Sequence, residues 1–100
     1  MEKNKYSDEF QLIAMAGSSR SKSMMALRHA RIGNFEEAYA LLEKAEEEMR
    51  NAHQCQLQVS GNGNTEISIL TVHSQDHLAM ASVTYDLVSE MIQILKEKQI

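Results

Sequence analysis

The stretch GNFEEAYALLEKAEEEMRNA, residues 33–52, decides the fold predicted for this chain. Gly33 suits the left-handed position that ends a helix. Asn34 can cap the next helix, and Glu37 three residues later completes a capping-box-like pattern. Apolar residues then recur at helical spacing: Phe35, Ala38, Leu41, Leu42, Ala45, Met49 and Ala52. The stretch therefore predicts an amphipathic helix that follows an earlier helix after a short turn.

The earlier helix is predicted to begin near Ser7, because Asp8 and Glu9 then place negative charge in the first turn, where the helix dipole favours it. Its expected apolar face consists of Phe10, Ile13, Ala14, Met24, Leu27 and Ala30. Gly17 is unusual in a helix interior, since glycine lowers helix propensity there. We therefore expect Gly17 to mark a close approach to a neighbouring backbone or ligand.

A third helix is expected after the loop Ser60-Gly61-Asn62-Gly63-Asn64, which is rich in turn-forming residues. It would open at about residue 66 and run almost to the C-terminus. A short strand over residues 66–72 is the main rival, because β-branched residues are frequent there. The pattern that favours a helix is Leu70, His73, His77, Met80, Thr84, Leu87 and Met91.

We accordingly predict an all-α chain with a single helical domain over residues 1–100 and helices at about 7–32, 35–58 and 66–97. The sequence has no proline and only four glycines, so little interrupts long helices. Helices joined by short loops bury their apolar faces best as an antiparallel three-helix bundle. A bundle of this size buries limited apolar area, so we also expect self-association, with polar residues at a subunit boundary.

Composition excludes several classes of protein. The formal net charge of −4 argues against a nucleic-acid partner. A single cysteine, Cys55, excludes an intramolecular disulfide framework and fits a reducing compartment. The first residues lead into no signal-like apolar run, and no stretch looks long and apolar enough to span a bilayer. These features predict a soluble, cytoplasmic protein.

Three ionisable residues lie close together in the expected third helix. His73, Asp76 and His77 follow one another at spacings of three and one, which places them on one side of a helix, about one turn apart. Ile69 and Met80 flank them, so this side is otherwise apolar and faces a core or an interface. Polar groups in such a place are costly unless they have partners, which makes them candidates for function.

The first functional reading is a phosphoryl carrier. A neutral histidine ring nitrogen is nucleophilic near pH 7, and the N–P bond it forms is labile enough to pass the group onward. Such transfer also needs a partner that orients the ring and donors for the phosphoryl oxygens, which His77 and Gln75 could supply. Asp76 would repel these oxygens unless it is turned away, paired or bound to a cation. The spacing alone does not decide which histidine is the nucleophile.

Two other readings remain open on these residues alone. The first is a metal-dependent hydrolase or metal-binding helical bundle, because two histidines at i and i+4 with an acidic residue between them resemble the His-x-x-Glu-His pattern of some zinc hydrolases. His29 or His53 would then have to approach from another helix. In the second, His73, Asp76 and His77 form only a hydrogen-bonded polar layer that fixes the register of the bundle.

Four segments together resemble a known family. Val72-His73-Ser74-Gln75-Asp76-His77-Leu78 is similar to the Val-His-Ala-Gln-Asp-His-Leu signature of the enzyme IIA components of the lactose/cellobiose (chitobiose) class of the bacterial phosphoenolpyruvate-dependent sugar phosphotransferase system. Ala16-Gly17-Ser18-Ser19-Arg20-Ser21 and Gly33-Asn34-Phe35-Glu36-Glu37-Ala38 resemble that family's first helix and following turn. Ala52-His53-x-x-Gln56, where polar residues continue the apolar spacing, resembles the end of its second helix. The resemblance spans about residues 10–95.

The resemblance implies a specific site. Members of this family are three-helix bundles that form homotrimers. They accept a phosphoryl group from the carrier HPr on one histidine, which corresponds to His73, and pass it to a cysteine of enzyme IIB. Asp76 corresponds to an aspartate at the trimer axis, where three copies bind one divalent cation, expected to be Mg²⁺. Gln75 and His77 correspond to supporting residues of this phosphotransferase component.

The resemblance also implies a role in the uptake and phosphorylation of a β-linked disaccharide such as cellobiose or lactose. The sugar binds to the membrane permease component, so this chain would meet the membrane only indirectly. The sequence departs from the family pattern where Ser74 and Ser19 replace alanines, and Ser74 would add a hydroxyl near the nucleophile. The metal-dependent alternative and a non-catalytic helical adaptor that has kept the fold are the competing expectations.

Overall fold

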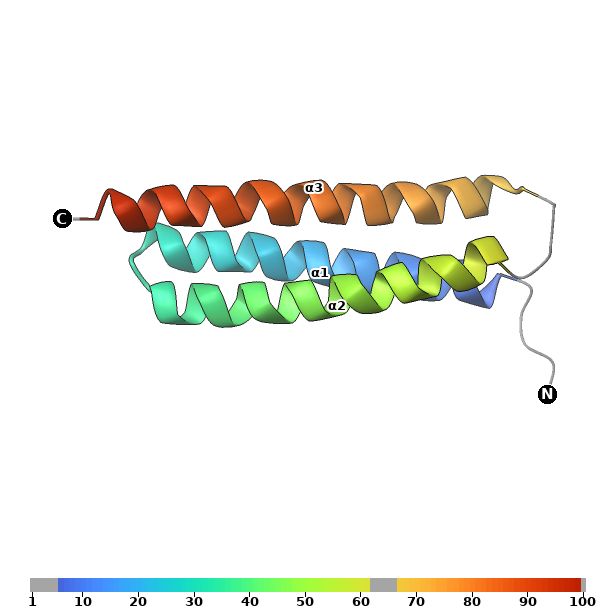
Figure 1. The fold of residues 1–100 in the computed structure, drawn as a ribbon, viewed down its shortest axis with the longest axis horizontal. Coiled ribbons are helices and arrows are strands. Elements are labelled where there is room, and N and C mark those ends of the chain that lie inside the picture. Colours follow the sequence, from blue (N-terminus) through green and yellow to red (C-terminus); the bar gives the residue numbers. More distant parts are fainter. Residues whose placement is uncertain (1–5, 62–66, 100) are drawn as a thin grey trace.

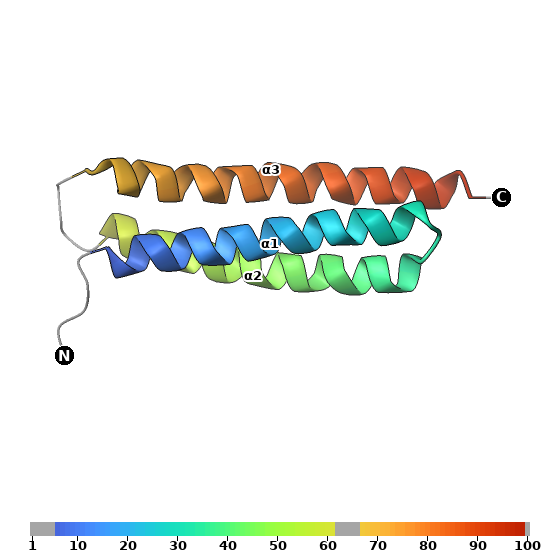
Figure 2. The ribbon, with the colours of Figure 1, turned by 180° about the vertical axis from the view of Figure 1, so that it is seen from behind.

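The computed structural model describes residues 6–61 and 67–99, and in this part of the chain it contains three long helices (Figure 1). They are α1 (Ser7–Arg31), α2 (Phe35–Gly61) and α3 (Ile69–Glu97). The helices lie side by side, with α1 and α3 running in one direction and α2 in the other (Figures 1 and 2). The predicted all-α bundle with alternating helix direction is confirmed.

The turn between α1 and α2 forms as predicted. Gly33 has a φ of +83°, the left-handed conformation that favours glycine. Its N–H donates to the carbonyl of Ala30 at 3.0 Å, and the N–H of Asn34 donates to the carbonyl of His29 at 2.9 Å. The carbonyl of Asn34 then accepts from the N–H of Ala38 at 3.1 Å, at the start of α2. This turn reverses the chain within three residues and makes α1 and α2 antiparallel.

Two helix ends differ from the prediction. Helix α2 continues to Gly61 rather than ending near residue 58. Helix α3 begins at Ile69 because Ser68 is extended (φ −105°, ψ 165°) and caps it. The strand alternative is wrong for residues 69–72, which are helical. Residues 62–66, which include most of the predicted loop and the predicted start of the third helix, lie outside the described residues.

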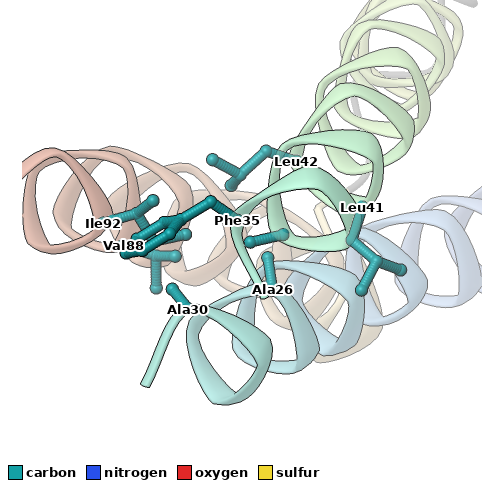
Figure 3. Packing of buried hydrophobic residues seen from close by; sticks show 8 residues of the cluster. Ala26, Ala30, Phe35, Leu41, Leu42, Val88 and Ile92 are labelled. Carbon is teal, nitrogen blue, oxygen red and sulfur yellow. The ribbon is translucent and has the colours of Figure 1, made fainter. Parts of the chain in front are cut away.

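The apolar residues predicted for α2 form its buried face, and the core consists of two clusters. The cluster near the α1–α2 turn contains Ala26, Ala30, Phe35, Ala38, Leu41, Leu42, Val88 and Ile92 (Figure 3). The cluster at the other end contains Leu12, Ala52, Cys55, Val59 and Leu78. Val59 and Cys55 therefore continue the α2 face, and the expectation that His53 and Gln56 do so is wrong, since His53 is exposed and Gln56 half-buried.

The predicted apolar face of α1 is correct only in part: Ala30 is buried and Met24 and Leu27 pack against the core, whereas Ala14 is exposed. Phe10 is 56% exposed, and the buried residues are Glu9, Leu12, Ala16, Ser19, Ser23, Ala26 and Ala30. Five of these seven are Ala or Ser, so close packing of α1 on its neighbours uses small side chains that an apolar pattern does not reveal. Gly17 is not explained by crowding: no described atom would lie within 4 Å of a Cβ at this position.

Helix α3 carries apolar residues on two opposite sides. Its inward side contains the buried residues Ser74, Leu78, Ala81, Val88 and Ile92. The opposite side, here called the outer apolar face, contains the exposed residues Ile69, Val72, Met80, Val83, Leu87, Met91 and Ile94. The sequence therefore identifies the helix correctly, but the predicted pattern includes none of its buried residues, and Met80, Leu87 and Met91 of that pattern lie on the outer apolar face.

The apolar residues of α3 also bear on the expectation that no stretch of the chain could span a membrane. By length and composition alone, Ile69–Glu97 is sufficient to cross a membrane, so the expectation that no stretch meets this criterion is wrong. The core helix of a soluble bundle meets the same criterion, and here one side of α3 packs against the other helices.

Polar contacts join α1 to α2 along their flank. The Ser19 hydroxyl donates to the carbonyl of Ala45 at 2.7 Å in the buried interface. The Lys22 ammonium lies 2.5 Å from the Glu48 carboxylate and also donates to Ser18. Burial alone would raise the pKa of Glu48, but the hydrogen bonds from Lys22 and Ser18 and the charge of Lys22 outweigh it, and the net pKa lies below the usual 4.5.

This lowered pKa predicts acid sensitivity. Because the folded-state pKa lies below the unfolded one, the ionised carboxylate stabilises the fold at neutral pH, and this stabilisation is lost as the pH falls through the folded-state pKa. Glu48→Gln should therefore lower the free energy of unfolding by about 0.5–1 kcal/mol at pH 7 and by less below pH ~4. Urea unfolding at one fixed protein concentration measures the difference. Glu47→Gln, an exposed control on the same helix, should show no such pH-dependent gap.

Candidate functional site

The three candidate residues lie near the beginning of α3, on the side turned away from α1 and α2. His73 and Asp76 are exposed, and His77 is half-buried. Asp76 lies among residues of the outer apolar face, between Val72 and Met80. The structure thus places the cluster at a potential interface rather than in the core.

The two histidine rings are in direct contact. Nε2 of His73 lies 3.1 Å from Nε2 of His77, and the rings meet edge to face with centroids 4.6 Å apart and planes at 88°. A hydrogen bond between two ring nitrogens requires one to donate and the other to accept. One of the two rings therefore keeps an unprotonated Nε2 with a lone pair, and each ring limits the rotation of the other.

The beginning of α3 borders a hollow beside His73. The Ser68 hydroxyl oxygen accepts from the N–H of Thr71 at 3.1 Å and caps the helix. A pocket of about 360 Å³ lies here, lined by Ile67, Ser68, Ile69, Val72, His73 and Asp76. Helical side chains lean toward the N-terminus, so His73 lies toward the first turn, where the helix dipole favours negative charge.

Gln75 lies on another side of α3 from His73. Residues at i and i+2 do not face each other on a helix, and within one chain the structure does not bring Gln75 to His73. The carbonyl oxygen of the Gln75 side chain instead accepts from Nε2 of Gln56 on α2 at 2.5 Å, in a half-buried contact. Sequence reasoning did not select Gln56, although the Ala52-His53-x-x-Gln56 motif contains it.

Ser74 does not contribute a hydroxyl to the site. It is fully buried, and its Oγ donates to the carbonyl of Thr71 at 2.7 Å. The expectation of an extra hydroxyl near the nucleophile is therefore wrong, because the residue after His73 points into the bundle.

The metal-binding alternative finds no complete ligand set among the described residues of one chain. Over residues 6–61 and 67–99, no three His, Cys, Asp or Glu side chains lie close enough together to hold a metal ion. The nitrogen atoms of His73 and His77 that face each other are engaged in their mutual contact. Asp76 remains as a single carboxylate from this chain.

A protein-family model matches residues 8–96, almost the whole chain. Its description is PTS system, Lactose/Cellobiose specific IIA subunit. The lichenan-specific phosphotransferase enzyme IIA component of Bacillus subtilis is 37% identical over 88% of this chain and 84% of its own length. The oligo-beta-mannoside-specific EIIA component of the same organism is 38% identical over 91% of this chain and 86% of its own.

Solved structures are similar to the whole bundle. The crystal structure of the PTS cellobiose specific enzyme IIA from Bacillus anthracis has a TM-score of 0.86 and 38% identity, covering 97% of this chain and 93% of that one. The IIA(Chitobiose) chain in a solution structure of its complex with HPr, from Escherichia coli, has a TM-score of 0.82 and 26% identity, covering 96% and 97%. The bundle, including the start of α3, thus has close structural relatives.

The cap of α3 can be tested separately from any activity. Ser68→Ala removes the hydroxyl that accepts from the Thr71 N–H, which should destabilise the first turn by about 1 kcal/mol. Amide hydrogen exchange of Thr71 and Val72 should become about fivefold faster, while exchange in the middle of α3 stays unchanged. Thr84→Ala, which removes a hydroxyl bonded within α3 to the Met80 carbonyl, is the matched control and should leave Thr71 unaffected. Unchanged exchange at Thr71 in Ser68→Ala would contradict this account of the cap.

Proposed function

Since the chain belongs to the lactose/cellobiose-specific IIA subunit family of the phosphotransferase system, we propose that it is a cytoplasmic phosphoryl carrier with His73 as its nucleophile. As a member of this family it is a phosphotransferase component. We choose His73 because it contacts His77 and lines the pocket at the start of α3. Asp76 and Ser68, which caps α3, also line this pocket.

The proposed reaction consists of two transfers. In the first, a lone pair on a ring nitrogen of His73 attacks the phosphorus carried by HPr, an N–P bond forms, and the bond to HPr breaks with its electron pair leaving on HPr. In the second, the cysteine thiolate of enzyme IIB attacks the same phosphorus, an S–P bond forms, and the electron pair of the N–P bond returns to His73. Neither transfer consumes water, so a site that limits the access of water favours transfer to the acceptor over hydrolysis of the N–P bond.

His77 has a defined part in this scheme. When its Nε2–H donates to His73, the lone pair on Nε2 of His73 stays available in the neutral ring. After transfer, the same N–H group lies one helical turn from the phosphoryl oxygens and can donate to them. The positive end of the α3 dipole adds to this stabilisation of negative charge.

The partners follow from the relatives. One similar structure is a IIA(Chitobiose)–HPr complex, which supports HPr as the phosphoryl donor for this chain. Enzyme IIB is the proposed acceptor. The names of relatives include lichenan, oligo-beta-mannoside, lactose and cellobiose, which supports a β-linked disaccharide as the transported sugar. The permease component would bind that sugar, so contact with the membrane is indirect.

We further propose that three copies associate through the outer apolar face of α3. The exposed residues Ile69, Val72, Asp76, Met80, Val83, Leu87 and Ile94 recur at spacings of three, four or seven residues, as on one side of a helix that packs against copies of itself. A contiguous apolar stripe of this length is unusual on the surface of a monomer and marks an interaction surface. Association on this face would bury the stripe and bring three Asp76 carboxylates to a common axis.

Asp76 fits a shared divalent cation at this axis. Carboxylate oxygens are ligands that Mg²⁺ prefers, and waters can complete its coordination. When bound, the cation supplies positive charge that offsets the mutual repulsion of three carboxylates. Each chain would contribute a single carboxylate to this cation.

The nucleophile is tested by labelling. His73→Ala should abolish acid-labile phosphate uptake from phosphoenolpyruvate, enzyme I and HPr and leave helical circular dichroism unchanged, because the covalent acceptor is removed. His77→Ala should lower the labelling rate by about tenfold or more but retain a labelled site. His53→Ala, an exposed histidine on α2, is the control and should label like the parent. Labelling that survives in His73→Ala and disappears in His77→Ala would reverse the assignment.

A metal-dependent hydrolase would instead show no labelling, stoichiometric zinc, and activity lost on chelation.

The axial carboxylate is tested by Asp76→Leu. This change removes both the repulsion and the need for a cation, so the trimer should be at least as stable as the parent. Addition of a chelator should change the midpoint of thermal unfolding of the parent trimer but not that of the Asp76→Leu trimer. Asp86→Leu is the matched control on an exposed carboxylate of the same helix and should keep the parent's response to chelator. A destabilised, chelator-sensitive Asp76→Leu trimer would contradict the axial model.

A further inference from the structure

The Asp76 carboxylate lies beside the nucleophile, although the proposed function gives it a role only in cation binding. His73 and Asp76 are three residues apart on α3, so their Cβ atoms lie on adjacent turns, about 5–6 Å apart. Both side chains are exposed, and both line the pocket of about 360 Å³ at the start of the helix. A phosphoryl group on His73 would therefore share this pocket with a carboxylate.

Nothing in one chain offsets the charge of Asp76. Over residues 6–61 and 67–99, its side chain forms no ion pair and no hydrogen bond. A phosphoryl group carries a charge of about −1.5 to −2 near pH 7. For a carboxylate about 7 Å away, Coulomb's law with the dielectric constant of water makes the phosphorylated state about fivefold less favourable. The phosphorylated state of His73 is therefore weakened by its own helix.

The next carboxylate on α3 provides a natural comparison. Asp86 is also exposed, but it follows Asp76 by ten residues, which is about 15 Å along the helix. At physiological ionic strength, salt screens the interaction of exposed charges over about 8 Å. Asp86 should therefore have little effect on a phosphoryl group at His73, whereas Asp76 acts on it directly.

We propose that Asp76 sets how readily the phosphoryl group leaves His73, and that a divalent cation on Asp76 adjusts this equilibrium. The inference rests on the proposed function, because it requires His73 as the nucleophile and, for the cation, the trimer. The ionised carboxylate favours release of the group to enzyme IIB. A cation shared by three carboxylates offsets their charge, so the chain retains the group more strongly. The bonds that form and break in each transfer stay the same.

The equilibrium between phospho-HPr and the chain tests the carboxylate. Purified phospho-HPr is mixed with the chain in the presence of chelator and without enzyme I, phosphoenolpyruvate or enzyme IIB. Mass spectrometry under non-acidic conditions then gives the phosphorylated fraction of each protein. Asp76→Asn should shift the distribution toward the phosphorylated chain by about fivefold, because a neighbouring negative charge is removed. Asp76→Glu, which keeps the charge, and Asp86→Asn, which removes a distant one, should both match the parent.

An equilibrium distribution separates this role from a structural one. A residue that only orients His73 or assists docking changes the forward and reverse rates equally and leaves the distribution unchanged. The shift in Asp76→Asn should also shrink as KCl is added, since salt screens exposed charges. A distribution equal to the parent's, or a shift that salt does not reduce, overturns the inference and leaves the carrier function intact. Absence of uptake from phospho-HPr, or uptake that survives in His73→Ala, overturns the proposed function itself.

The cation is tested by its affinity, without any transfer reaction. If saturating Mg²⁺ favours the phosphorylated form about threefold at each site of the trimer, phosphorylation of all three sites must raise the affinity for Mg²⁺ by about thirtyfold, because the coupling is reciprocal. Titration calorimetry of phosphorylated and unphosphorylated trimers with MgCl₂ measures this factor. Asp76→Asn should show neither effect. Equal affinities of the two parent forms, or an unchanged Mg²⁺ response in Asp76→Asn, would overturn the cation's part in the inference.

Discussion

Helix α3 presents apolar side chains on two opposite sides, and α1 and α2 can cover only one of them. Leu78, Val88 and Ile92 fill the bundle core, while Ile69, Val83 and Leu87 remain exposed on the outer apolar face. The exposed stripe is costly in water, because apolar area that could be buried stays hydrated. Burial against copies of the same helix, as proposed above, would remove this cost and would set where the polar residues of neighbouring chains lie relative to one another.

The position of the site near the first turns of α3 gives its residues their chemical character. Ser68 caps the helix, and the positive end of the helix dipole lies near His73. The hydrogen bond between His73 and His77 leaves one of the two facing ring nitrogens unprotonated. A transferable phosphoryl group needs moderate stabilisation from neutral donors and a dipole, since a fixed cation in direct contact would hold it too firmly.

Some parts of this structure were predicted correctly from the sequence, and others were not. The α2 face, from Phe35 to Ala52, follows one uninterrupted apolar pattern beside an acidic surface, so its buried side was predicted correctly. Helix α1 packs through Ala16, Ser19 and Ser23, whose small size matters more than their polarity, and apolar spacing selected Phe10 instead. The pairing of His73 with His77 followed from helical spacing. The Gln56–Gln75 bond could not be predicted, because it joins residues on separate helices.

The most direct test of the central claim, a trimer that carries phosphate on each His73, is native mass spectrometry of the full chain. The protein is incubated with phosphoenolpyruvate, enzyme I and HPr and then measured before and after brief acid treatment. The account predicts a particle of three chains that carries up to three phosphoryl groups, all of which acid removes, as expected of N–P bonds. A single-chain particle, or phosphate that survives acid, would contradict it.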